Sequence, residues 1–267
     1  MPRKIPKSLF DAKLLPLWRD SKRFTAHPLR VAPTGGKSKH FSGGPAPHAG
    51  SKCPECKQKL TLLWDLDLTD PLIPDYAREG FSPCTRLPLY ICWQCVTASY
   101  AVTSDARLKC FPFDHHSDYL EEGETPFPDA PLEMPRRPIA LQRIPSTLDA
   151  LASLANVIGL NELDKPARVA LDQSLSTKLS TDWDLPFSQF GGQPLVSPRR
   201  GDMVCPNPKC PANELTHPYG EMQRPYLMKE MALIQWRDEP ILAEHCFQLL
   251  YFICGICFSM RAEYRCS

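Results

Sequence analysis

The cysteines constrain this chain more than any other feature, because eight of the twelve fall into four close pairs. The pairs are Cys53 with Cys56, Cys92 with Cys95, Cys205 with Cys210, and Cys254 with Cys257. Three of the pairs have CxxC spacing, whereas Cys205 and Cys210 have CxxxxC spacing. The last pair follows the second by 162 residues. This interval predicts an internal duplication.

Other segments repeat in the same order around these pairs. A Gly-Gly turn precedes the first pair of each half, and an apolar run that predicts a strand precedes the last pair of each half. The matched segments are 41–45 with 190–194, 63–67 with 233–237, and 87–91 with 249–253. The sequence therefore predicts two copies of one β unit.

Each set of four thiols has the chemistry of a structural zinc site. Four thiolates in two close pairs give a tetrahedral all-sulfur set, which suits Zn²⁺ and leaves no open position for water. We therefore predict two structural zinc ions, one in each half. The alternatives are reduced, buried cysteines or disulfides, and His48 or His217 as substitute ligands. Disulfides are disfavoured because the N-terminus lacks the apolar region of a signal peptide, which predicts a reducing, cytoplasmic location.

Four cysteines remain outside these sets. Cys84 and Cys246 occupy matched positions eight residues before a pair, and we expect them to pack in the core. Cys110 and Cys266 have no counterpart in the other half and are expected to be free thiols.

Charge is unevenly distributed, although the formal net charge is only +1. Residues 1–40 carry ten basic and two acidic residues, a local charge of +8, which leaves −7 for the rest. This basic arm can bind nucleic acid or an acidic protein surface, or lie against the acidic body of its own chain. The segment 114–133 contains seven acidic and no basic residues, and it predicts a solvated loop or a docking strip for a basic partner. The candidate partner-binding residues in it are Asp114, Asp118, Glu121, Glu122 and Glu124.

The middle of the chain predicts a linker followed by helices. Six prolines between residues 126 and 145 indicate an extended segment, because proline removes a backbone donor and restricts its neighbour. The apolar spacing in the next segment predicts two short helices. The predicted parts are a basic arm at 1–40, a first zinc-knuckle β unit at 41–113, an acidic Pro-rich linker at 114–145, a helical segment at 146–182 and a second zinc-knuckle β unit at 183–267. The predicted fold class is α+β, mainly antiparallel β.

The sequence lacks the common catalytic motifs, including G-x-S-x-G, H-E-x-x-H, the P-loop and the dinucleotide fingerprint. Asp65 and Asp67 would share one face of a strand, as a pair of catalytic carboxylates would require, but the matched positions hold Gln235 and Arg237. A structural role at the strand end is therefore favoured. The aromatic residues of the strands and knuckles are expected in the core rather than in a base-stacking platform: Trp64, Tyr90, Trp93, Trp236, Tyr251 and Phe252.

Several of these motifs resemble the YwqG-like family of bacterial proteins, whose domain has no assigned function. The resemblance is carried by Ser188–Pro194, by the following cysteine pair, and by Leu233–Trp236 and Leu249–Ile253. It extends over 25–105 and 183–266 as two degenerate copies, in which Ser42 interrupts the first turn and Asp65 replaces a glutamine. The resemblance implies antiparallel β structure with peripheral helices. It also implies an immunity role, because such members often occur beside bacterial toxins.

Three functions follow as hypotheses. The preferred one is a non-catalytic protein-binding module, most concretely an immunity protein that occludes the active site of a cognate toxin such as a nuclease. The alternative is a nucleic-acid-binding zinc protein that uses the basic arm, and the third is a hydrolase whose site the sequence does not identify. No membrane partner is expected, since no apolar run approaches the roughly 18 residues of a membrane span.

Overall fold

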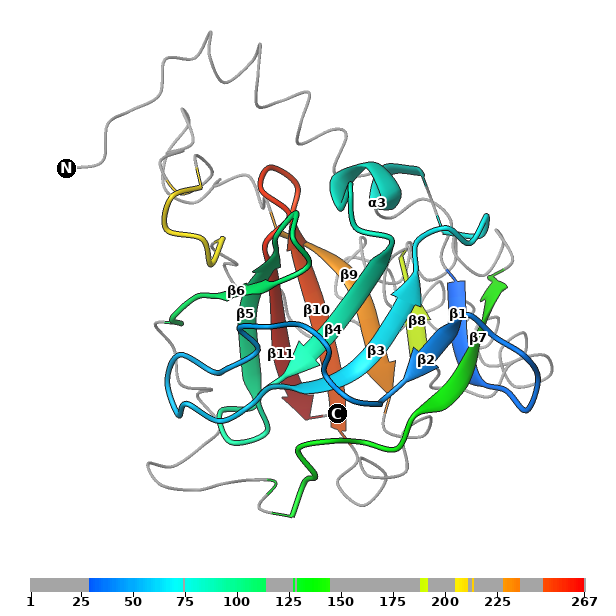
Figure 1. Ribbon diagram of the computed structural model, residues 1–267, viewed down its shortest axis with the longest axis horizontal. Coiled ribbons are helices and arrows are strands. Elements are labelled where there is room, and N and C mark those ends of the chain that lie inside the picture. Colours follow the sequence, from blue (N-terminus) through cyan, green and yellow to red (C-terminus); the bar gives the residue numbers. More distant parts are fainter. Residues whose placement is uncertain are drawn as a thin grey trace, which may run out of the picture.

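The computed structural model describes residues 29–73, 75–113, 127, 129–144, 188–191, 205–210, 213, 228–235 and 247–266. These residues form one eleven-stranded sheet and a single short helix (Figure 1). The elements of the first half are β1 (Leu29–Pro33), β2 (His40–Ser42), β3 (Thr61–Asp67), α3 (Asp75–Gly80), β4 (Arg86–Ile91), β5 (Thr97–Val102) and β6 (Leu108–Cys110). Those of the second half are β7 (Arg137–Arg143), β8 (Ser188–Phe190), β9 (Met228–Gln235), β10 (Phe247–Cys254) and β11 (Met260–Cys266).

Every ladder of this sheet is antiparallel, in the order β4-β3-β2-β7-β1-β8-β9-β10-β11-β5-β6. The predicted α+β class is therefore wrong, because strands from both halves join in one sheet and α3 is the only helix of the described part. The helical segment predicted at 146–182 lies outside the described residues. The two β units thus share a single sheet instead of forming separate lobes.

Two strands in the middle of the sheet connect the halves. β1 and β7 pair with Ala32 opposite Ala140, and each then pairs with the short strand of the other half, β1 with β8 and β7 with β2. The strand that precedes each unit therefore completes the sheet of the other unit, about an approximate two-fold axis. The sequence did not predict either strand. It assigned β1 to the basic arm, and it assigned β7, which contains Pro138, to the linker.

Equivalent backbone groups are bonded in both halves. The amide of Gly43 donates to the Leu63 carbonyl at 2.8 Å, and the amide of Gly191 donates to the Met231 carbonyl at 2.7 Å. Both glycines have φ near +68°, a conformation that favours glycine. Leu63 and Met231 each interrupt the register with the next strand, as bulges. The structure therefore equates Leu63 with Met231, whereas the sequence matched it with Leu233.

The sheet curls until the free edge of β4 faces β5, and β3 and β4 lie in front of β9 and β10 in Figure 1. β10 and β11 pair over seven residues, but the equivalent β4 and β5 meet only at one isolated bridge. Two buried tyrosines satisfy the backbone at this break. The Tyr100 hydroxyl accepts from the Tyr90 amide at 2.8 Å and donates to the Pro88 carbonyl at 3.0 Å, and the Tyr251 hydroxyl donates to the Tyr90 carbonyl at 3.1 Å.

The aromatic side chains of the strands pack in the interior. Trp64, Tyr90, Trp93, Tyr251 and Phe252 are all buried, as the sequence led us to expect, while Trp236 lies outside the described residues. No helix in the described part of the chain is long and apolar enough to cross a membrane.

Candidate metal centres

Each set of four cysteines is assembled by the pairing of two neighbouring strands. In the first half, one cysteine pair precedes β3 and the other follows β4, and in the second half one pair precedes β9 and the other follows β10. Since β3 pairs with β4 and β9 pairs with β10 in antiparallel fashion, the start of one strand lies beside the end of its neighbour. The distant cysteine pairs of each half therefore meet at one end of their strands.

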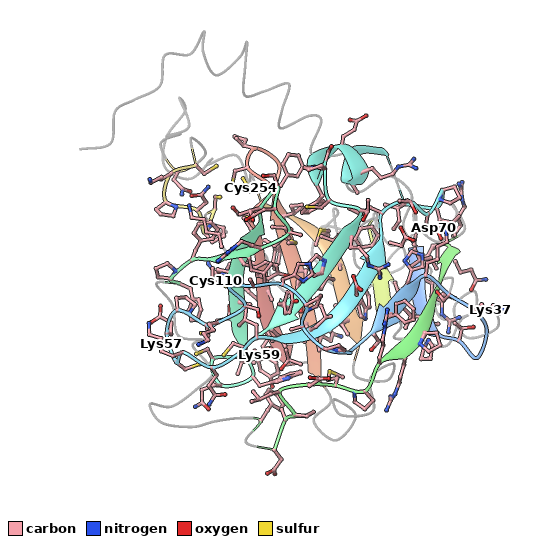
Figure 2. The ribbon with its side chains drawn as sticks, viewed as in Figure 1. Lys37, Lys57, Lys59, Asp70, Cys110 and Cys254 are labelled. Atoms are coloured by element: carbon pink, nitrogen blue, oxygen red, sulfur yellow. The ribbon has the colours of Figure 1, made fainter. Side chains whose placement is uncertain are left out.

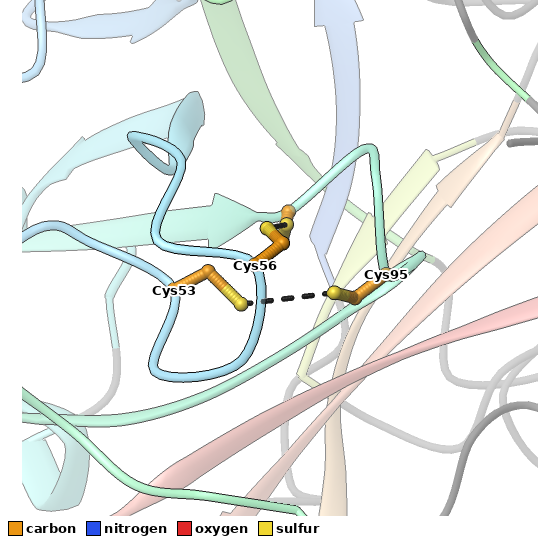
Figure 3. A group of neighbouring side chains, drawn as sticks. Cys53, Cys56 and Cys95 are labelled. Carbon is orange, nitrogen blue, oxygen red and sulfur yellow. Dashed lines mark hydrogen bonds between the residues drawn. The ribbon is translucent and has the colours of Figure 1, made fainter.

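The first site has the dimensions of a metal centre. The Sγ atoms of Cys53 and Cys95 lie 3.8 Å apart, and those of Cys56 and Cys92 lie 3.4 Å apart (Figure 3). All four sulfurs lie within 4.8 Å of one another. A tetrahedral ion with metal–sulfur bonds of about 2.3 Å requires sulfur–sulfur edges of about 3.8 Å, whereas a disulfide requires about 2.0 Å. The four thiols can thus hold one metal ion.

The second site repeats this arrangement. The Sγ atoms of Cys205 and Cys257 lie 3.4 Å apart, and those of Cys210 and Cys254 lie 3.8 Å apart, again with all four inside 4.8 Å. In each site, the leading pair is the one before the two strands and the trailing pair is the one after them. As in the first site, the first cysteine of the leading pair lies beside the last cysteine of the trailing pair. The wider CxxxxC spacing of the leading pair therefore does not prevent the set from closing.

The three CxxC turns share an unusual backbone. The residue after each second cysteine has positive φ, at 64° for Lys57, 53° for Val96 and 56° for Phe258. L-residues with side chains rarely adopt this conformation, and a β-branched residue such as valine adopts it least readily. The same strained turn at three positions indicates that it is needed to direct both sulfurs of a pair toward one point.

The thiols are largely shielded from water, and their mutual hydrogen bonds favour ionisation of only some thiols in each set. Cys53 and Cys92 are buried while the other two thiols of the first site are half-buried, and three of the four thiols are buried in the second site. Hydrogen bonds from Cys92 and then Cys95 lower the pKa of Cys53. Hydrogen bonds from the three other thiols of its site, led by Cys205, likewise lower the pKa of Cys257. Each set therefore stabilises a thiolate, the form that binds metal.

The two sites lie at opposite ends of the sheet. Successive strands alternate in direction, so β4 and β10, seven positions apart in the strand order, run in opposite directions. The turns that follow them, which carry the trailing cysteine pairs, therefore emerge at opposite ends. Figure 2 shows Cys254 of the second site and Lys57, the neighbour of Cys56 in the first site, at separate places on the molecule.

The second site packs against the helix of the first half. The rings of Phe81 and Phe258 are 5.8 Å apart in an edge-to-face contact, and Phe258 directly follows Cys257. A Cβ atom added to Gly80, at the end of α3, would lie 2.0 Å from the Phe258 ring. The connection between β3 and β4 is thereby packed against the four-cysteine site of the other half.

The histidines of the described part make hydrogen bonds to groups other than the sulfurs. His48 Nδ1 lies 2.8 Å from the Tyr90 hydroxyl, and burial lowers the pKa of His48. His40, which the sequence did not single out, accepts from the Asp67 amide through Nδ1 at 3.1 Å, so its Nε2 carries the proton and donates to Asp70 at 2.9 Å. Four sulfurs already complete each set, so His48 is not needed as a substitute ligand. His217 lies outside the described residues.

The two aspartates of β3 have separate structural partners. Asp65 accepts from the Arg86 side chain at 2.7 Å. Asp67 accepts from the amide and the hydroxyl of Thr69 at 2.8 and 2.6 Å. Burial opposes the ionisation of Asp67, but these hydrogen bonds dominate and its pKa is lowered. The contacts agree with a structural role at the strand end.

The described cysteines outside the two sites are isolated thiols. Cys84 packs against the core and Cys110 donates to the Gly50 carbonyl at 3.4 Å. Burial raises the pKa of both thiols, that of Cys110 to about 11, which disfavours the reactive thiolate form at neutral pH. The side chains of Cys246 and Cys266 are not among those described.

The candidate partner-binding acids lie outside the described residues: Asp114, Asp118, Glu121, Glu122 and Glu124. The same holds for residues 1–28 of the basic arm. Comparisons with protein-family models, curated protein sequences and solved structures found no match for this chain. The similarity to the YwqG-like family therefore rests on short motifs alone.

Proposed function

We propose that this chain is a non-catalytic protein-binding module whose single sheet is held in shape by two structural zinc ions. The observation that carries the proposal is the pair of closed four-sulfur sites at opposite ends of the sheet. All-sulfur tetrahedral sites suit Zn²⁺, and four protein ligands leave no coordination position for a reacting water. Such ions supply folding energy and not chemistry.

The polar contacts near the sheet support the same conclusion. Asp65, Asp67 and His40 would be the natural acid–base candidates of β2 and β3. Arg86 donates to the Asp65 carboxylate, and Thr69 donates to the Asp67 carboxylate. The two ring nitrogens of His40 bond the Asp67 amide and the Asp70 carboxylate. Groups bound in this way position strands and turns, which suits a rigid recognition surface.

The specific form that we propose is an immunity protein for a bacterial toxin. It rests on the similarity to the YwqG-like family and on the acidic segment 114–133, whose charge complements a basic, nucleic-acid-binding toxin surface. Thiolate sites of this kind need reduced cysteines, which is consistent with a cytoplasmic location. The basic arm at 1–40 remains the basis of the alternative, a nucleic-acid-binding role.

Co-expression with the product of the neighbouring gene tests this function. We expect the two proteins to co-purify in chelator-free buffer and the chain to protect cells when that product is toxic. Neutralising Asp118, Glu121 and Glu122 to their amides should weaken the complex. The matched control neutralises three exposed acids elsewhere, Glu55, Glu79 and Asp105. Absence of both co-purification and protection would rule out the immunity function.

A further inference from the structure

The loop that carries the leading cysteine pair of the first site is also strongly basic. Lys52, Lys57 and Lys59 are exposed, and Glu55 is the only acid among residues 51–60. Figure 2 shows Lys57 and Lys59 on the same side of the molecule as Cys110 of β6. The preceding residue of that strand, Lys109, is exposed as well. The chain therefore holds several ammonium groups on one rigid, metal-held turn.

The local geometry brings like charges together. Lys52 and Lys59 face each other in an antiparallel bridge. Directly opposed residues of an antiparallel pair have Cβ atoms about 5 Å apart, and like charges there are destabilising. Among the described residues, no ion pair with a carboxylate involves Lys52, Lys57 or Lys59. An anion placed over the bridge would relieve this repulsion.

Charge compensation of the metal site does not account for the cluster. Four thiolates around Zn²⁺ carry a net charge of −2, which nearby lysines can offset. The second site would carry the same charge with more of its sulfurs buried, yet Lys209 is the only lysine in its described leading loop, 205–210. Within the described leading loops, the internal repeat thus places three lysines at the first site and one at the second.

The surface of this turn also lacks what a protein partner would use. Its exposed residues are the three lysines, Glu55 and Gln58, and its apolar residues are buried or half-buried. Protein interfaces take most of their affinity from buried aromatic and apolar anchors, whereas binding to a nucleic-acid backbone is dominated by lysine and arginine. We propose that the first metal-bearing turn contacts the phosphate backbone of nucleic acid through Lys52, Lys57 and Lys59. This activity is independent of the protein-binding function proposed above.

Fluorescence anisotropy with the full zinc-loaded chain tests the proposal. The probes are a short labelled duplex DNA of random sequence and a short single-stranded RNA, titrated between about 50 and 300 mM salt. The test variant carries Lys52→Gln, Lys57→Gln and Lys59→Gln. The control variant removes the same charge from exposed basic residues elsewhere, with Arg136→Gln, Arg143→Gln and Lys209→Gln.

We expect the test variant to bind duplex DNA more than tenfold less tightly at about 50 mM salt. The slope of log K against log salt should become shallower by about 2 to 3, because each lost phosphate contact changes that slope by about 0.9. The control variant should keep the wild-type slope, and both variants should retain two zinc ions per chain. Equal losses of DNA affinity in both variants would show that only the net charge matters and would overturn the proposal. The proposal would be overturned if the wild-type chain did not bind, or if the test variant lost zinc. Equal competition by polyglutamate would also overturn it and would favour an acidic protein partner.

Discussion

Replacing Tyr100 by phenylalanine should destabilise this protein severely, because one hydroxyl group replaces the missing ladder between β4 and β5. The Tyr100 hydroxyl satisfies the Tyr90 amide and the Pro88 carbonyl, and all three residues are buried. In the other half, the equivalent strands β10 and β11 pair directly and need no such group. The substitution keeps the ring and removes only the bridging oxygen.

The expected magnitude follows from the two backbone groups left without partners. Each buried, unsatisfied donor or acceptor costs about 1–3 kcal/mol, so the Tyr100→Phe variant should lose about 2–6 kcal/mol. A typical domain has a total free energy of unfolding of about 5–15 kcal/mol. Tyr251→Phe is the matched control, because Tyr251 is equally buried but satisfies only the Tyr90 carbonyl. It should lose about 1–3 kcal/mol.

Urea unfolding of the zinc-loaded protein, followed by tryptophan fluorescence, measures both losses. Hydrogen exchange adds a local readout, because the Tyr90 amide should exchange faster in Tyr100→Phe than in Tyr251→Phe. A loss below about 0.5 kcal/mol for Tyr100→Phe, or a larger loss for Tyr251→Phe, would refute the reasoning that hydroxyl groups close the sheet at this break.

Three further predictions concern the metal sites, the helix contact and acid stability. Metal analysis of chelator-free protein should give two zinc ions per chain. The Cys92→Ser and Cys254→Ser variants should each hold about one zinc ion and melt at a lower temperature. A zinc content near zero in the wild-type protein would contradict the metal assignment. Gly80→Ala should cost about 1–3 kcal/mol, since its methyl group would overlap the Phe258 ring, whereas Gly35→Ala has open space and should melt like the wild type. Asp67→Asn should be destabilised at pH values above the ordinary pKa of an aspartate, and this difference should shrink as the pH falls through the lowered pKa of Asp67, because the bonds from Thr69 stabilise the carboxylate more than a neutral carboxyl or amide group; a difference independent of pH would contradict that account.

The cysteine spacing indicated the membership of both four-cysteine sets without any structure. A CxxC or CxxxxC pair can direct two sulfurs to one point because the turn is local, and a constant interval between copies indicates which distant pairs belong together. The strands before the trailing pairs were equally visible, because the apolar runs that became β4 and β10 are continuous and end at a cysteine.

Register was beyond the reach of the sequence. The segment at Leu63 was matched with Leu233, two residues from its true counterpart Met231. A shift of two preserves the side-chain alternation of a strand, so the pattern cannot distinguish the two alignments, whereas a shift of one would reverse every face. Only the bulge and the glycine hydrogen bond decide it.

The sequence by itself determined the chemistry of this protein: reduced cysteines in two sets of four, and an internal repeat. The tertiary structure alone decided that the repeat forms one sheet, because β1 and β7 carry weak signals and exchange partners between the halves. Ligand spacing is local and can be read along the chain, but strand exchange depends on contacts between residues far apart in the sequence.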